Sequence, residues 1–194
     1  MVRIINKDEL KNDPSLLSQL KNSVFIYPTD TIYGIGCDAT NEKLVARVRE
    51  IKKSAEQPFS IIIPNKNSIL SNCETDDRAA PWLGKLPGPF TLIFKVKKKF
   101  FAGNVVPLRN NTIGIRVPNN WFYLYIKRMK VPIITTSANI TGGDFMTCLD
   151  DLDPQIKRKV DFIVYDGELK GKPSTIVHLE KAELEVKERK KITS

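Results

Sequence analysis

The chain has 194 residues, of which 41% are hydrophobic, and it carries a net charge of +9 at pH 7. These values fit a single globular domain over residues 1–194 with a real hydrophobic core, and they exclude a disordered chain. No apolar stretch approaches the length of a membrane-spanning helix, and the 3 widely spaced cysteines argue against a disulfide framework or a cysteine-based metal site, so we expect a protein of the reducing cytoplasm.

The first part of the chain is expected to form helices around two buried strands. Residues 7–21 have the pattern of a helix that Pro14 interrupts. A second helix follows Asn41, whose side chain suits an N-cap, and its apolar face has helical spacing at Leu44, Val45, Val48 and Ile51. Strands are expected at 23–27 and 59–63, and short helices at 66–84.

The second part of the chain is expected to contain more strands than helices. The expected helices lie at 121–129 and around 151–160. The expected strands lie at 90–97, 112–118, 132–136, 161–165, 174–179 and 183–187. Because strands and helices are mixed without strict alternation, the pattern predicts an α/β fold with a twisted, mixed open sheet flanked by helices.

Residues 27–36 are the most informative segment of the chain. They follow an apolar run at 23–26 and contain several hydroxyls, one carboxylate and two glycines. Residues just beyond the carboxyl end of a strand commonly form small-molecule sites in α/β proteins. Hydroxyl-rich segments of the same form occur at 135–139 and 173–175. Together the three segments predict a polar cleft, and the positive net charge favours an anionic ligand.

Several familiar catalytic motifs are missing from the sequence. It has neither a Walker-type phosphate loop nor a dinucleotide-binding glycine motif, and it lacks a paired-histidine metal motif. We interpret the single histidine, His178, as structural because it lies in an apolar strand, which disfavours a Ser-His-Asp hydrolase or a zinc enzyme. An enzyme of this composition would work by positioning and electrostatics, as in phosphoryl or nucleotidyl transfer.

Arg116 is a charge within an apolar strand, where an unpaired charge is costly. Two interpretations stay open for it, a structural salt bridge and a planar fork that binds a carboxylate or phosphate. Lys52 and Lys53 are ordinarily read as exposed cations at a helix C-terminus. Ser137 and Asn139 fit an ordinary turn as well as a segment that approaches a ligand closely.

Six segments match, in the same order, the blocks of one family. They lie at 27–34, 51–53, 87–91, 112–118, 136–139 and 173–176. By these segments, which run from about residue 23 to 180, the chain resembles the YrdC/Sua5 (TsaC) family of threonylcarbamoyl-AMP synthases in its short single-domain form. The resemblance implies a YrdC-like twisted open sheet with a basic concave face.

The family's reaction is what the resemblance implies for this chain. L-threonine, bicarbonate or CO2, and ATP combine to give threonylcarbamoyl-adenylate and pyrophosphate. A downstream threonylcarbamoyl-transferase complex then modifies adenosine 37 of tRNA, and tRNA or another RNA is a candidate ligand of the basic face. ATP is a substrate that carries Mg2+ with it, and no set of carboxylates looks like a dedicated metal site.

The resemblance also assigns roles to individual residues. The residues expected to stabilise charge in catalysis are Lys52, Ser137 and Asn139. Those expected on the threonine side are Thr29, Thr31, Tyr33, Arg116 and Ser174. Those expected on the ATP side are Lys53, Ser54, Thr112, Thr147 and Arg189.

The sequence departs from the family pattern after the first long helix. The family has Lys-x-Arg there, whereas this chain has Lys52, Lys53 and Ser54. Losing a phosphate-binding fork is expected to weaken ATP binding or transition-state stabilisation by about 1–3 kcal/mol. Lys53 offers a point charge as a partial substitute, and Arg49 lies one helical turn before it.

Two alternatives belong to other functional classes. A non-catalytic YrdC-like protein that binds RNA would agree with the net charge and with Ser54. The intact segments around Arg116 and Ser137 argue against it. The much longer hydrogenase-maturation enzyme with a YrdC-like domain is disfavoured because this chain lacks cysteine-rich zinc motifs.

Overall fold

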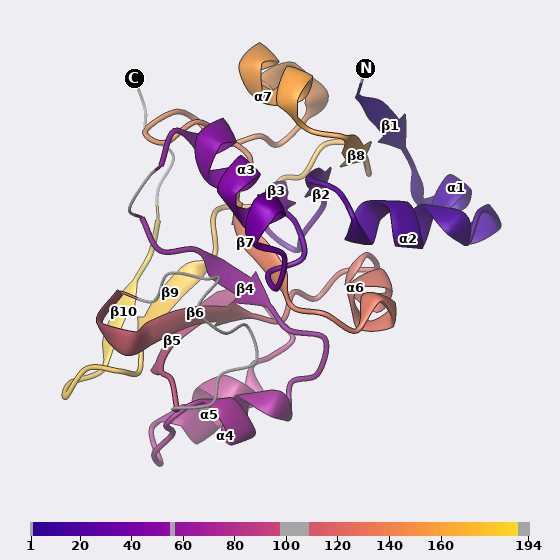
Figure 1. The fold of residues 1–194 in the computed structure, drawn as a ribbon. Helices are drawn as coiled ribbons and strands as arrows, with labels where there is room; N and C mark the ends of the chain where they lie inside the picture. Colours follow the sequence, from indigo (N-terminus) through magenta and orange to yellow (C-terminus); the bar gives the residue numbers. More distant parts are fainter. Residues whose placement is uncertain (1, 55–56, 98–108, 190–194) are drawn as a thin grey trace.

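The computed structural model describes residues 2–54, 57–97 and 109–189 (Figure 1). In these residues, ten strands form one mixed sheet in the order β1-β8-β2-β3-β7-β4-β6-β5-β9-β10. The strands are β1 Arg3–Ile5, β2 Phe25–Tyr27, β3 Gly34–Gly36, β4 Ser60–Ile62, β5 Phe90–Lys95, β6 Thr112–Arg116, β7 Ile133–Ser137, β8 Phe162–Val164, β9 Thr175–His178 and β10 Glu185–Lys187. The predicted α/β class with a mixed open sheet is confirmed.

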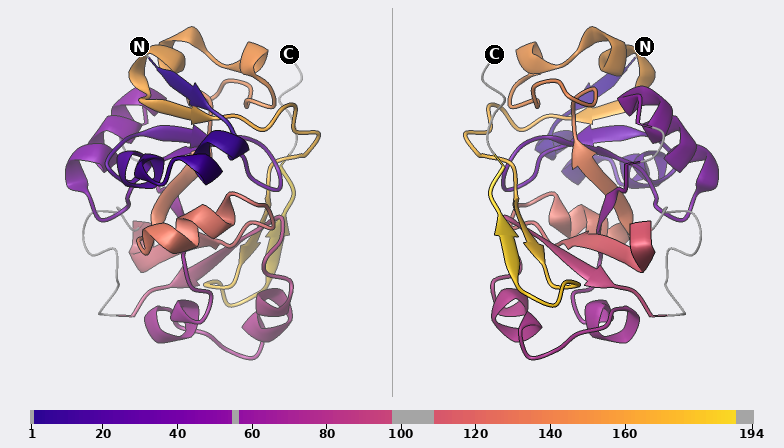
Figure 2. Two further views of the ribbon diagram at one scale, coloured as in Figure 1. Left: turned by 90° about the vertical axis from the view of Figure 1, so that its right-hand side faces the viewer. Right: turned by 90° about the vertical axis from the view of Figure 1, so that its left-hand side faces the viewer.

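Helices cover both faces of the half of the sheet that contains β1, β8, β2 and β3 (Figures 1 and 2). The α-helices described are α1 Lys7–Asn12, α2 Ser15–Lys21, α3 Glu42–Lys52, α4 Ser68–Asn72, α5 Ala79–Gly84, α6 Tyr123–Met129 and α7 Pro154–Lys159. Side chains alternate between the two faces along a strand. Phe25 and Tyr27 of β2 therefore pack with α1, α2 and α6, whereas Ile26 joins the cluster that contains α3 and α7.

The half of the sheet that contains β5, β6 and β9 is covered differently. Leu92 and Phe94 of β5 belong to the same hydrophobic cluster as Ile26, which here includes residues of α4 and α5, the helices below β5 in Figure 1. The alternate residues of β5 face the opposite way and line a cavity. This uncovered face is where the molecule has room for a ligand.

Helix α3 begins and ends as the sequence predicts. The side chain of Asn41 accepts a hydrogen bond from the amide of Leu44 at 3.2 Å, which satisfies one of the free amides at the helix start. The helix ends at Lys52, and the following C-cap residue, Lys53, has a left-handed backbone with a φ of 50°. This turn leaves Lys53 exposed and Lys52 buried at the last helical position.

The glycines of the 27–36 segment form a strand, where the sequence alone suggests a loop. β3 pairs antiparallel with β2 and with β7, and Gly34 lies opposite Ser137. A Cβ on Gly36 would lie 1.8 Å from the carbonyl oxygen of Ile134. Glycine is required at this position because the neighbouring backbone comes too close for a side chain. The short strand β1, which pairs with β8, is a second element without a sequence signal.

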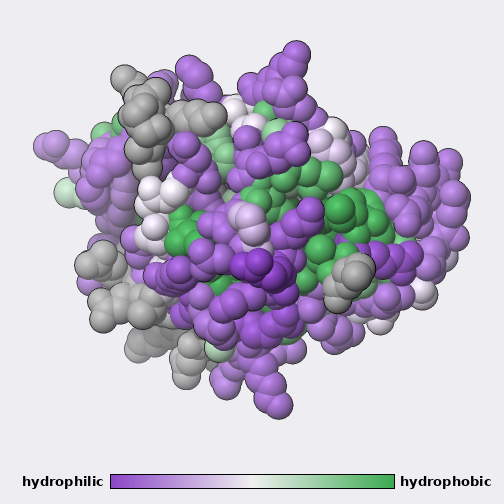
Figure 3. Space-filling view, turned by 90° about the horizontal axis from the view of Figure 1, so that it is seen from above, coloured by the Kyte–Doolittle hydropathy of each residue, from purple (hydrophilic) through white to green (hydrophobic). Residues whose placement is uncertain are grey.

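The face of the molecule above α7 is largely polar (Figure 3). The view shows hydrophilic residues over most of this face, with hydrophobic residues grouped between them. Among the residues that the structure describes, none of the helices has the length and apolarity that crossing a bilayer requires.

Candidate functional site

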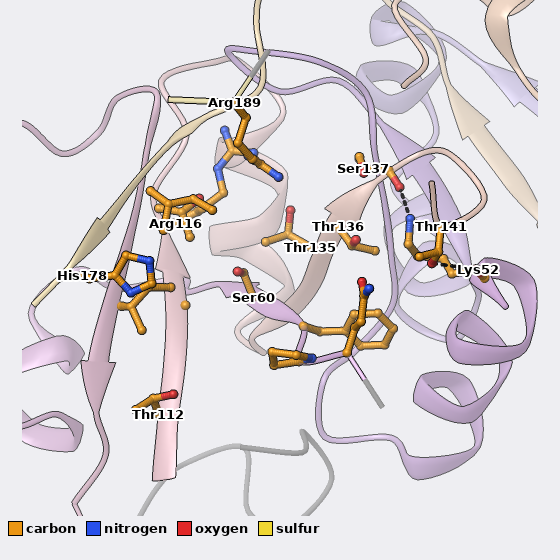
Figure 4. A pocket seen from close by; sticks show the side chains of 18 of the residues that line it. Lys52, Ser60, Thr112, Arg116, Thr135, Thr136, Ser137, Thr141, His178 and Arg189 are labelled. Atoms are coloured by element: carbon orange, nitrogen blue, oxygen red, sulfur yellow. Dashed lines mark hydrogen bonds between the residues drawn. The ribbon is translucent and has the colours of Figure 1, made fainter. Parts of the chain in front are cut away.

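A cavity of about 690 Å³ lies over the uncovered face of the sheet (Figure 4). One row of residues crosses five strands to form its floor. The strand registers place His178 opposite Ile93, Ile93 opposite Gly114, Gly114 opposite Ser60, and Ser60 opposite Thr135. Because alternate residues of a strand share a face, Thr91 and Lys95 of β5, and Thr112 and Arg116 of β6, line the same cavity.

Gly114 lies in the middle of this row and, having no side chain, takes up no space in the cavity. A Cβ at this position would lie 2.3 Å from Oγ of Ser60 and 3.1 Å from Cδ1 of Ile93. A side chain at this position would therefore force Ser60 or Ile93, which both line the cavity, to move.

Lys52 holds the segment 137–139 at one end of the cavity. Its Nζ donates to the carbonyl oxygens of Ser137 at 2.7 Å and Asn139 at 2.6 Å, and to Oδ1 of Asn139 at 3.2 Å. Its own carbonyl oxygen accepts hydrogen bonds from the amide and hydroxyl of Thr141. Burial lowers the pKa of the ammonium to about 8.

Ser137 and Asn139 are joined to each other. Oγ of Ser137 donates to Oδ1 of Asn139 at 2.5 Å, and Nδ2 of Asn139 donates to the carbonyl oxygen of Gly143 at 2.5 Å. Both residues line the cavity with Lys52. The three predicted catalytic residues are therefore brought together by the fold.

Arg116 lies at a second corner of the cavity and contacts the 27–36 segment. Its Nη2 donates to Oδ1 of Asp30 at 2.9 Å and to Oγ1 of Thr31 at 3.1 Å. The side chain of Arg116 is 7% exposed, and its buried Nε has no hydrogen-bond partner among the described residues. Burial lowers the pKa of Arg116, and the Asp30 carboxylate opposes this effect.

Thr29 and Thr31 are buried behind this corner and are not among the described residues that line the cavity. The hydroxyl of Thr29 lies 2.9 Å from that of Thr31 and donates to the carbonyl oxygen of Ile32 at 2.7 Å. Tyr33 lines the cavity, and its hydroxyl donates to the carbonyl oxygen of Gly167 at 2.7 Å. The loop that carries both threonines is thus fixed on each side.

Arg189 brings a second guanidinium next to the first (Figure 4). Its Nη2 donates to Oγ of Ser174 at 2.8 Å, and that hydroxyl lies 2.7 Å from Oγ1 of Thr91. Burial lowers the pKa of Arg189, and the neighbouring charge of Arg116 lowers it further. Two adjacent cations repel each other, so an anion between them would be stabilised.

Three residues predicted on the ATP side are not among the described residues that line the cavity. Lys53 is exposed beyond the end of α3. Ser54 is buried, and its Oγ has no hydrogen-bond partner in the described part of the chain. The hydroxyl and amide of Thr147 both donate to Oδ2 of Asp151, at 2.5 and 2.8 Å. Thr112 and Arg189, the other two, do line the cavity.

Arg49 holds the chain that follows α3. Its Nη1 donates to the carbonyl oxygens of Ser54 at 3.2 Å and Gln57 at 3.0 Å. The guanidinium lies over the ring of Phe59, 4.3 Å from its centroid. Gln57 and Phe59 line the cavity, so Arg49 supports its rim from behind.

Three further polar residues line the cavity without having been assigned a site role from the sequence, namely Ser60, Thr91 and His178. Thr135, which also lines it, belongs to the predicted segment 135–139. The alternation of polar and apolar residues in the predicted strands is the signal that could have found the first three. In β5, for example, Leu92 and Phe94 are buried, whereas Thr91 and Lys95 face the cavity. Among the described residues, no group of three or more His, Cys, Asp or Glu side chains is arranged to hold a metal ion.

Comparison with protein families gives a match over most of the chain. The Sua5/YciO/YrdC family model, whose description is "Telomere recombination", matches residues 19–189. A Methanocaldococcus jannaschii protein named "Putative threonylcarbamoyl-AMP synthase" is 37% identical over 182 residues, which are 91% of this chain and 84% of that protein.

Solved structures share the fold. A variant of P. abyssi Sua5 has a TM-score of 0.79 and 26% identity, and the match covers 95% of this chain but 59% of the Sua5 chain. The same P. abyssi protein has been solved with L-threonine, with a TM-score of 0.75 and 24% identity over 95% of this chain and 56% of that one. E. coli YciO has a TM-score of 0.82 and 21% identity over 100% of this chain and 98% of that one.

Proposed function

The chain belongs to the Sua5/YciO/YrdC family, and we propose that it is a threonylcarbamoyl-AMP synthase. The name of the M. jannaschii relative supports this activity. The observation that carries it is Arg116, a buried guanidinium with an unused Nε, in a cavity that also contains Lys52, Ser137 and Asn139. Such a cavity suits a ligand that carries a carboxylate and phosphates.

The corner around Arg116 is the proposed place of the amino acid. Asp30 and Thr31 use Nη2 of Arg116, which leaves Nε with donor capacity for a carboxylate. The hydroxyl of Thr31 accepts from Arg116 and that of Ser174 accepts from Arg189, so these two buried residues orient the guanidiniums rather than line the cavity. The P. abyssi relative that was solved with L-threonine agrees with this ligand class.

The segment 137–139 is the proposed place of the phosphates and the carbamate. Lys52 brings a positive charge to this segment and orients it through two carbonyl oxygens. The hydroxyl of Ser137 donates to Oδ1 of Asn139 and so orients this amide. One Nδ2 hydrogen of Asn139 is donated to Gly143, and the second is the donor for developing negative charge at the cavity wall. Lys52 acts here mainly as a positioning residue because its ammonium already donates to three oxygen atoms.

The reaction proceeds in two steps in this proposal. The amine of L-threonine attacks the carbon of CO2, loses a proton and becomes a carbamate. A carbamate oxygen then attacks the α-phosphorus of ATP, which enters with Mg2+, and the bond to the leaving pyrophosphate breaks. The protein contributes by positioning and by electrostatic stabilisation, which is sufficient for nucleotidyl transfer. The product would pass to a threonylcarbamoyl transferase that acts on tRNA.

Pyrophosphate release by the purified protein tests the proposal. We expect release from ATP only when L-threonine and bicarbonate are both present. Ser137→Ala is expected to lose this activity, and Ser18→Ala, on the exposed side of α2, is the matched control that should keep it. ATP binding without any release would overturn the proposal and favour the RNA-binding alternative, which a salt-dependent RNA titration would then measure.

A further inference from the structure

His178 lies at the end of the cavity farthest along the floor from Thr135. It is the last residue of β9, and Figure 4 shows its ring extending from the strand toward the cavity. Nδ1 lies 2.8 Å from Oε1 of Glu180, which is the one carboxylate among the described lining residues. Neither the sequence motifs nor the proposed reaction gives this pair a role.

The carboxylate determines what the other ring nitrogen offers. An ionised carboxylate only accepts hydrogen bonds, so Nδ1 of His178 is the donor in this contact. Nε2 of the neutral ring is then a hydrogen-bond acceptor. Among the described residues, Nε2 has no hydrogen-bond partner, so a ligand in the cavity can donate to it.

The charges around the cavity indicate which part of a nucleotide reaches His178. Lys52, Arg116 and Arg189 attract phosphates and carboxylates to the other corners. At the His178 end, the Glu180 carboxylate disfavours phosphate. The charge of Lys181 is offset by its ion pair with Glu185, and that of Lys95 is screened because the side chain is exposed to solvent. The uncharged nucleoside is therefore the part of ATP that suits this end. The floor from His178 to Thr135 crosses four strand spacings, about 19 Å at about 4.8 Å each, which is long enough for a nucleoside and its phosphates.

We propose that His178, oriented by Glu180, is a specificity residue that accepts a hydrogen bond from the nucleoside of ATP. The donor is the amine of the adenine base or a hydroxyl of the ribose. The inference rests on the proposed use of ATP but not on the transfer step. An oxo base would present an acceptor to Nε2, so a contact to the amine would select ATP against ITP.

Nucleotide binding measured by calorimetry tests this role without any need for catalysis. Three analogues each lack one candidate donor, namely ITP, 2′-deoxy-ATP and 3′-deoxy-ATP. For the wild type we expect ATP to bind about 3- to 10-fold more tightly than the analogue that lacks the actual donor. The analogue that loses affinity identifies the base or the ribose as the donor. His178→Leu removes the acceptor and should abolish the preference, whereas His178→Gln, which keeps an acceptor, should retain much of it.

Inorganic tripolyphosphate is the control ligand because it has no nucleoside. Its affinity should be the same in wild type and His178→Leu, whereas a collapsed cavity would weaken it too. Equal binding of ATP and all analogues by the wild type, or an unchanged preference in His178→Leu, overturns the inference. If ATP binds with the expected preference but no pyrophosphate is released, the proposed function fails and the role of His178 stands.

Discussion

At the scale of single residues, the two most enclosed cations of the cavity have different tasks. The ammonium of Lys52 is saturated by three oxygen atoms of the segment 137–139, so its charge shapes the protein around it. The guanidinium of Arg116 is buried with Asp30 and keeps an unused nitrogen. The first positions the site, and the second has capacity for a ligand.

The pKa of Lys52 leads to a prediction about ATP affinity. Burial lowers this pKa to about 8, so the ammonium loses its proton as the pH rises through about 8. Segment 137–139 then loses its charged anchor, and we expect ATP affinity to fall by roughly tenfold between pH 7 and pH 9.5. Lys52→Arg, whose side chain stays charged, should show a much smaller fall. Calorimetric affinities that stay constant over this range in the wild type would contradict the assignment.

The two interpretations of Arg116 that the sequence leaves open can be separated by paired substitutions. Arg116→Met leaves the Asp30 carboxylate buried without its cation, so the free energy of unfolding should fall by about 3–5 kcal/mol. Urea denaturation of the double variant Arg116→Met with Asp30→Asn should recover most of this stability. L-threonine binding should stay lost in the double variant. A double variant that still binds L-threonine would leave Arg116 with a structural role alone.

At the scale of elements, the strands β5, β6 and β9 combine two environments in one pattern. Along each strand, one set of alternate residues joins the hydrophobic cluster that includes α4 and α5, and the other set faces the cavity. Their sequences are therefore apolar with polar residues in between. Sequence periodicity was sufficient to predict these strands and the capped helix α3. It could not identify β3, because a glycine that permits close strand packing looks the same in sequence as a glycine in a loop.

Gly114 gives a prediction at this scale. Gly114→Ala would place a Cβ 2.3 Å from Oγ of Ser60, so we expect a loss of about 1–3 kcal/mol in the free energy of unfolding. The double variant with Ser60→Ala removes that oxygen and should regain part of the loss. Denaturation curves of the two single variants and the double variant measure this coupling. Strictly additive effects would show that the two positions do not meet.

At the scale of the whole molecule, the site depends on contacts that no local pattern contains. The motif resemblance selected Lys52, Ser137, Asn139 and Arg116, which the fold brings to one cavity. It also selected Lys53, Ser54 and Thr147, which lie elsewhere among the described residues because a helix end and an Asp151 contact direct them away. His178 was interpreted as structural because it lies in an apolar strand, and the structure places it on the face of that strand that lines the cavity, which the apolar pattern alone does not reveal.

Joint binding of both substrates should stabilise the entire chain. A ligand present at 100 times its dissociation constant adds about 2.7 kcal/mol, which for a chain of this size raises Tm by about 5–10 °C. In thermal melts of the wild type with L-threonine and ATP, we expect a rise in Tm of this size. With L-threonine alone, we expect a much smaller rise in Tm for the double variant of Arg116 and Asp30. A wild-type Tm that neither substrate changes would argue against the cavity as their site.

The separation in sequence of the groups that meet in the cavity also has a kinetic consequence. The contact of Lys52 with Ser137 closes a loop of 85 residues, and that of Arg116 with Asp30 joins residues 86 apart. Closing such loops costs entropy before the contacts form, which slows folding. When about two thirds of the chain has been made, strands β2, β3 and β4 still lack the neighbours β7 and β8 with which they pair in the finished sheet. Ser137, Asn139 and Arg189 lie in the last third of the chain, so substrates meet a complete cavity only after that part has been made.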